Sequence, residues 1–137
     1  MNGPSDRTLV AMRRLAAQVQ DELALAGLPV AAGLHQLVSQ GVRVEIDALD
    51  DDDPGVVVTW RPHPSLANAA DRAVAARDVG AGTMQRFGEI QRAMLPAIAA
   101  VLTAAGFVID TEAGLPPHAV RVTAAPPDGG TVGMLER

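Results

Sequence analysis

The chain has 137 residues and a mass of 14.2 kDa, with 48% hydrophobic and 20% charged residues, which suits one folded domain and excludes a disordered polar chain. It contains no cysteine, which excludes a disulfide scaffold and a thiolate zinc site. The formal net charge of −5 leaves no cationic surplus to displace phosphate counterions, so nucleic acid is not an expected partner.

The first predicted element is a helix over residues 5–26. Its apolar residues recur every three or four positions, which lays one hydrophobic stripe along a helix: Leu9, Met12, Ala16, Val19 and Leu23. Gly27 follows at the position of a left-handed cap, and Pro29 prevents the helix from resuming. Residues 28–41 predict a loop with a short helical turn.

Two strands joined by an acidic turn come next, over residues 42–49 and 56–61. Apolar and polar residues alternate in both, which is typical of half-buried strands whose even-numbered side chains face the core. We expect the pair to form an antiparallel hairpin. A register with Glu45 opposite Arg61 pairs opposite charges on the outer face, so we expect it rather than the register that sets Arg43 there.

Two helices follow the second strand, over residues 66–78 and 83–105. Pro62 and Pro64 end the strand, because proline cannot donate a hydrogen bond to a ladder. The longer helix has an apolar stripe at helical spacing, formed by Phe87, Ile90, Met94, Ile98, Val101 and Ala105. The short helix is mostly alanine, so it either covers the core or packs closely against another protein.

The chain ends with strands over residues 107–110 and 118–124 and a tail rich in proline and glycine over residues 126–137. We expect the tail to be flexible unless something holds it. We therefore expect residues 1–125 to form a single domain.

The two halves of the chain resemble each other. Ala26-Gly27-Leu28 ends the first long helix as Ala105-Gly106-Phe107 ends the last, and Val56-Val57-Val58-Thr59 matches Val120-Arg121-Val122-Thr123. Alanine, glycine and valine are common here, so the resemblance can also arise by chance. If the αββ repeat is real, two hairpins form one four-stranded antiparallel sheet about a pseudo-twofold axis. We therefore predict an α+β fold with two long helices packed on one face of that sheet.

Several features of the sequence suggest the source and the cellular location of the protein. All 11 basic residues are arginine and 25 residues are alanine, which is typical of GC-rich bacterial coding sequences. No apolar signal-type segment follows the N-terminal charges, which favours the cytoplasm. The longest uncharged stretch, residues 93–109, is only marginally long enough for a membrane span, and it contains Pro96 and Gly106. A buried helix running into a strand explains it better, so we expect no membrane contact.

The candidate binding residues lie on the outer sheet face and at the ends of two strands: Arg43, Glu45, Arg61, His63, His118 and Arg121. His63 and His118 come near each other if their strands are neighbours, and such a pair can bind metal or move a proton. Two unrelated surface histidines in proline-flanked loops are the simpler interpretation. The acidic run Asp50 to Asp53 lacks the spacing of a calcium loop and reads as a solvated turn.

No nucleophile elbow, phosphate loop or dinucleotide fingerprint occurs, so we expect no catalytic residue, metal or cofactor. The sequence favours a non-catalytic protein-binding or assembly module. Its partner is another protein or a second copy, met through the polar sheet face or the helix over residues 66–78. Adaptors, secretion chaperones and immunity proteins are analogous in size and acidity only. The alternative is a small enzyme or ligand-binding domain with a pocket near His63 and His118.

Overall fold

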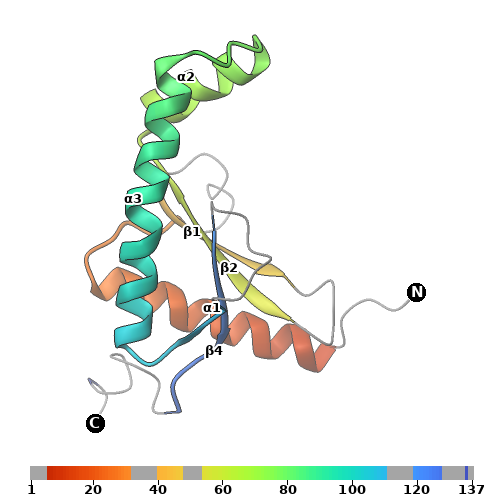
Figure 1. Cartoon of the computed structure of the whole chain (residues 1–137). Coiled ribbons are helices and arrows are strands. Elements are labelled where there is room, and N and C mark those ends of the chain that lie inside the picture. The colour runs from red at the N-terminus through yellow and green to blue at the C-terminus, as the bar shows by residue number, and fades with distance from the viewer. Residues whose placement is uncertain (1–5, 32–39, 48–53, 111–118, 128–134, 136–137) are drawn as a thin grey trace.

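The structure is a computed structural model that describes residues 6–31, 40–47, 54–110, 119–127 and 135. Three helices and four strands follow one another along the chain: α1 (Asp6–Leu25), β1 (Gly41–Asp47), β2 (Gly55–Arg61), α2 (Pro64–Ala75), α3 (Gly82–Ala104), β3 (Val108–Ile109) and β4 (Val120–Ala124). The strands form one sheet in the order β1-β2-β4-β3, with every neighbouring pair antiparallel (Figure 1). The predicted α+β fold is confirmed.

The even-numbered valines of the strands face the core, as their alternation predicts. Val42, Val56, Val58 and Val122 are completely buried. The hairpin register, in contrast, differs from the predicted one. Glu45 lies opposite Val57, and Gly41 lies opposite Arg61.

The observed register pairs all seven residues of β1 with all seven of β2. The predicted register keeps the same residues in the core but leaves the first four residues of β1 without partners on β2. A ladder hydrogen bond contributes about 0.5–1.5 kcal/mol, whereas an exposed ion pair contributes at most about 1 kcal/mol. The longer ladder therefore outweighs the charge pairing that guided the prediction.

Helices α1 and α3 cover the same face of the sheet. One continuous core joins buried side chains of both helices to the inward-facing strand residues: Met12, Leu15, Val19, Leu23, Val42, Val44, Val56, Val58, Leu95, Ile98, Leu102, Phe107, Val120 and Val122. The predicted stripe of α3 is only partly correct, because Leu95 and Leu102 are buried beside Ile98. All three lie in the second half of α3, so that half supplies the buried core contacts of the helix.

Both long helices end in the same capping motif. The Leu28 N–H donates to the Leu23 carbonyl at 3.1 Å, and the Phe107 N–H donates to the Leu102 carbonyl at 3.0 Å. Gly27 and Gly106 hold the positive φ that this Schellman geometry requires.

The register of the central strand pair is symmetric about the matched motifs of the two halves. Val57 pairs with Arg121, and these are equivalent positions of the proposed repeat. Val56 pairs with Val122, and Val58 with Val120, as a pseudo-twofold axis between Val57 and Arg121 requires. The two αββ halves thus share element order, helix caps and a symmetric central pairing.

Helix α2 ends in a similar motif, but with arginine at the left-handed position. Arg77 has φ 56, and the Asp78 N–H donates to the Ala73 carbonyl at 2.9 Å. A non-glycine residue in this conformation costs about 1–2 kcal/mol, part of which glycine loses again through its greater freedom in the unfolded chain. We expect Arg77→Gly to raise the free energy of unfolding by about 0.5–1 kcal/mol. Urea titration checks this, and Arg72→Gly within the helix, which should destabilise, is the control.

The uncharged stretch over residues 93–109 forms the end of α3 and the strand β3, as predicted, and among the described helices none is long and apolar enough to cross a bilayer. The first residue of the predicted tail packs against the end of α3. Pro126 is buried, and its Cβ lies within 3.0 Å of the place that a Gly106 side chain would take. Residues 128–134 and 136–137 lie outside the described part of the chain.

Candidate functional site

The outer face of the sheet carries the predicted polar residues, and several of them form ion pairs with one another. The strongest contact joins Arg121 on β4 to Asp47 on β1, with 2.6 Å between Nη1 and Oδ2. On β1 itself, Arg43 Nε lies 3.9 Å from Glu45 Oε1. The Arg121 side chain is only 11% exposed, so its ion pair with Asp47 lies largely within the sheet surface and not in solvent.

The ion pair between Arg121 and Asp47 spans three strands. Arg121 pairs with Val57 on the central strand β2, while Asp47 lies opposite Gly55 on the same strand. A Cβ at Gly55 would come within 3.0 Å of the Arg121 guanidinium. The absence of a side chain at Gly55 therefore lets the arginine pass over β2 to reach β1. Sequence reasoning missed this because Gly55 follows an acidic run and reads as part of the turn.

We expect a double-mutant cycle of Asp47→Asn and Arg121→Gln to give a coupling energy of about 1 kcal/mol in unfolding experiments. The short contact and the low exposure of Arg121 place the pair at the upper end of the range for exposed ion pairs. The matched control is the cycle for Arg43 and Glu45, whose longer contact and 56% exposed glutamate predict a coupling close to zero. Equal coupling energies in the two cycles would contradict this assignment.

Arg61, at the end of β2, connects the sheet to α2. Its Nη2 donates to Asp71 Oδ2 at 3.3 Å. Next to it, the Gln91 side-chain amide of α3 donates to the Trp60 carbonyl at 3.2 Å. Both contacts attach the helices to the last residues of the strand, so Arg61 has one partner within the protein, while its buried Nε has no hydrogen-bond partner among the described residues.

His63 caps the N-terminus of α2. Its Nδ1 accepts a hydrogen bond from the Ser65 N–H at 3.1 Å, and Pro64 occupies the first helical turn. The ring borders an open hollow that Trp60 and Ile90 also line. His118 lies outside the described residues, so the predicted histidine pair stays a prediction. Within the described residues, no group of three or more acidic, histidine or cysteine side chains is arranged to hold a metal ion.

Helix α2, the turn after it and the first half of α3 form a two-helix projection, here called the arm (residues 64–93). It extends beyond the sheet at the top of Figure 1. The fully buried side chains of α3 all belong to its second half. In the arm, only Ala67 and Ala70 are buried, so its two helices pack mainly on each other.

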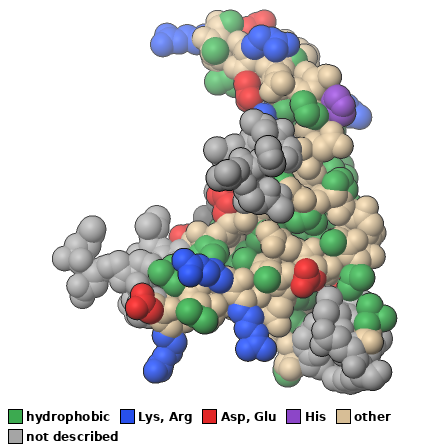
Figure 2. Space-filling model, turned by 180° about the vertical axis from the view of Figure 1, so that it is seen from behind, with side chains coloured by type: hydrophobic (Ala, Val, Ile, Leu, Met, Phe, Trp, Pro, Cys, Tyr) green, Lys and Arg blue, Asp and Glu red, His purple; other side chains and the backbone are tan. Residues whose placement is uncertain are grey.

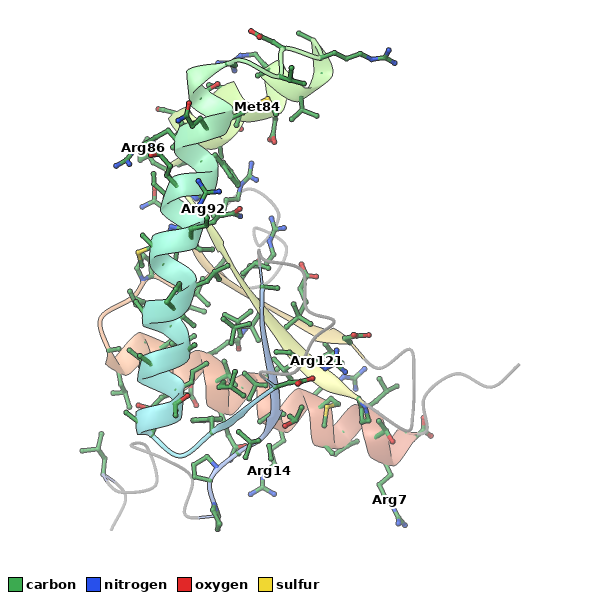
Figure 3. The ribbon with its side chains drawn as sticks, in the orientation of Figure 1. Arg7, Arg14, Met84, Arg86, Arg92 and Arg121 are labelled. Atoms are coloured by element: carbon green, nitrogen blue, oxygen red, sulfur yellow. The ribbon has the colours of Figure 1, made fainter. Side chains whose placement is uncertain are left out.

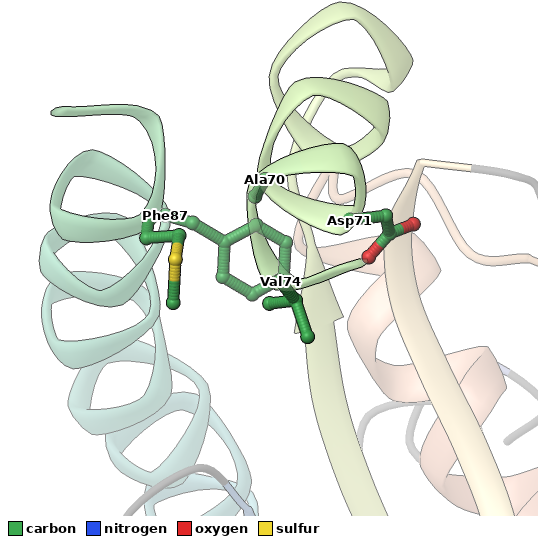
Figure 4. A pocket seen from close by; sticks show the side chains of 5 residues that line it. Ala70, Asp71, Val74 and Phe87 are labelled. Carbon is green, nitrogen blue, oxygen red and sulfur yellow. The ribbon is translucent and has the colours of Figure 1, made fainter. Parts of the chain in front are cut away.

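The arm exposes apolar side chains. Val74 is 60% exposed and Val79 is 88% exposed. An open hollow between the helices is lined by Ala70, Asp71, Val74, Met84 and Phe87. Figure 4 shows the Phe87 ring between α3 and α2, with Val74 beside it at the mouth of the hollow. In Figure 3, Met84 lies on the side of α3 toward α2, whereas Arg86 points away from the arm on the other side. One side of the arm is thus apolar and incompletely covered.

The helix over residues 66–78, which the sequence analysis proposes as a binding surface, is part of the arm. The residues that the prediction misses are Met84 and Phe87: Phe87 is assigned to the apolar stripe of the core, and Met84, about one helical turn before it, is not singled out. Comparison with known proteins adds no assignment, since no protein-family model, curated protein or solved structure matches the chain.

Proposed function

We propose that this protein is a non-catalytic protein-binding or assembly module of the bacterial cytoplasm, and that it binds its partner through the arm. The observation that carries the proposal is the incompletely covered apolar side of the arm, where exposed Val74 borders a hollow that Met84 and Phe87 also line. Apolar side chains that surround a shallow hollow on a projecting element are typical of protein-interaction sites.

The polar sheet face is a less suitable binding surface than the arm, because several of its charged side chains already have partners within the protein. Its most buried charge, on Arg121, is paired with Asp47, and Arg61 is paired with Asp71. A ligand on that face would have to compete with these internal contacts. On the arm, covering Val74 and Phe87 removes apolar surface from water at about 25 cal/mol per Å².

The proposal is tested with the full chain as bait in an extract of its host, in three forms: wild type, Val74→Glu and Val10→Glu. Val10 is the matched control, because it is a helix-surface valine that is 64% exposed on α1, away from the arm. We expect the wild type and Val10→Glu to retain the same protein, and Val74→Glu to retain at least tenfold less of it. The endogenous copy of this chain counts as a retained protein.

Retention that is equal in all three forms, or no specific retention by the wild type, would contradict the proposal. Circular dichroism and the melting temperature should be the same for the three forms, since both valines lie mainly in solvent.

A further inference from the structure

We propose that His63 is a pH-sensitive switch at the base of the arm: the neutral ring fixes the first turn of α2, and the protonated ring releases it. The switch lies where the arm leaves the sheet. Strand β2 ends at Arg61, Pro62 follows, and His63 is the cap residue directly before α2. The inference goes beyond the proposed function, because it concerns the isolated chain and requires no partner.

The side-chain hydrogen bond at the start of α2 depends on the charge of the His63 ring. Its Nδ1 accepts the Ser65 N–H at 3.1 Å, so this nitrogen carries a lone pair and the neutral ring has its proton on Nε2. A protonated imidazole carries a proton on both nitrogens and cannot accept a hydrogen bond. Protonation therefore removes the side-chain cap, while the His63 carbonyl still accepts from the Leu66 and Ala67 N–H groups.

The charges around the ring act in the same direction as the loss of the hydrogen bond. The N-terminus of α2 is the positive end of the helix dipole, which disfavours a cation at the cap. His63 borders a hollow whose described lining comes from β1, β2, α3 and the segments next to them, and in that lining Arg61 carries the only charge. Its partner, Asp71, belongs to α2 and is already paired with it. A proton on His63 is therefore opposed by both the helix and the neighbouring arginine.

Helix α2 has few other contacts that hold it in place. It extends beyond the sheet (Figure 1), and only Ala67 and Ala70 of its residues are buried. Its ion pair with Arg61 is weak, because the Asp71 side chain is 65% exposed. A helix of 12 residues is marginal without caps and tertiary packing. We therefore expect loss of the cap to raise the fraction of open α2 about fivefold, as for a typical side-chain cap.

Histidine is the residue type that ordinarily changes charge between about pH 5.5 and pH 8, and His63 is the only histidine in the sequence between residues 36 and 117. The arm itself carries only carboxylates and arginines as charged groups, and Figure 2 shows both signs on it. These residues are Asp71, Arg72, Arg77, Asp78, Arg86, Glu89 and Arg92. A change in α2 within this range of pH is therefore expected to follow the His63 ring.

NMR of the purified full chain at about pH 5.5 and about pH 8 tests the switch. We expect the protection of the α2 amides, after correction for the intrinsic pH dependence of exchange, to be about fivefold lower at the lower pH. The Ser65 amide resonance should titrate together with the His63 ring. Equal protection of α2 at the two pH values in the wild type would overturn the inference.

Two substitutions of His63 separate the cap from other effects of pH. In His63→Asn, a side-chain oxygen that does not titrate replaces the ring nitrogen as acceptor, so the protection of α2 should be the same at both pH values. His63→Ala has no side-chain cap at any pH and should show the lower protection at both. A pH dependence that His63→Asn retains, or an α2 that stays fully protected in His63→Ala, would overturn the inference.

The other two histidines of the chain provide the matched controls. His35→Gln and His118→Gln each remove one titrating ring and leave His63 in place. Both variants should keep the pH dependence of α2 seen in the wild type. Loss of that dependence in either one would assign the effect to a different histidine and overturn the inference.

Discussion

Gly41→Ala is expected to lower the free energy of unfolding by about 3 kcal/mol. Gly41 begins β1 with φ +100, a conformation that costs a non-glycine residue about 1–2 kcal/mol. An added Cβ would also overlap the backbone carbonyl of Pro29, and that oxygen accepts the hydrogen bond of the Val42 N–H at 2.8 Å. Backbone displaced by overpacking costs a further 1–3 kcal/mol or so.

The consequence reaches beyond one residue, because this contact fastens the segment after α1 to the outer edge of β1. The Ala31 N–H donates to the Val42 carbonyl at 2.9 Å, which completes a parallel bridge between Val30 and Val42. Moving Pro29 away from Gly41 therefore strains both hydrogen bonds of the bridge. Loss of this cover would expose an edge strand to pairing with other chains.

Urea titration measures the effect, and Gly27→Ala is the matched control. Gly27 has a similar positive φ of 92, but a Cβ there meets nothing within 4 Å. It should lose only the conformational part, about 1–2 kcal/mol. Equal losses for the two variants would mean that the contact with Pro29 relaxes freely, and would contradict the prediction.

Leu23→Ala is expected to lower the free energy of unfolding by about 2–5 kcal/mol. Leu23 is completely buried in the core that α1 shares with the sheet and α3. Removing its branched end loses the apolar burial and leaves a cavity that the surrounding valines fill only in part. The Leu23 carbonyl also accepts the capping hydrogen bond from Leu28, but this backbone contact is present in the variant as well.

Leu25→Ala provides the control for helix propensity and side-chain type. Leu25 lies two residues further on the same helix and is 49% exposed. Its replacement should cost less than about 1 kcal/mol. Chemical denaturation of both variants gives the difference directly, and a Leu25 effect as large as that of Leu23 would show that the helix end, not the core, limits stability.

The secondary structure and the buried face of each strand follow from local pattern. Alternation along Val42, Val44 and Ile46 allows only one face to be apolar, whatever strand lies beside it. Gly27 and Gly106 each stop a helix through their own backbone freedom, so both stops were predictable. These properties depend on residues that are close in the sequence, so they can be predicted from the sequence alone.

The register, the long-range ion pair and the arm depend instead on which segments meet. Glu45 and Arg61 were a reasonable pair by charge, yet the full ladder of β1 and β2 shifted them apart. Phe87 has the same helical spacing as the core residues of α3, but the sheet ends before it reaches that turn, so it faces α2 and solvent. Periodicity shows which side of a helix is apolar, and only the packed structure decides whether another element is there to cover it.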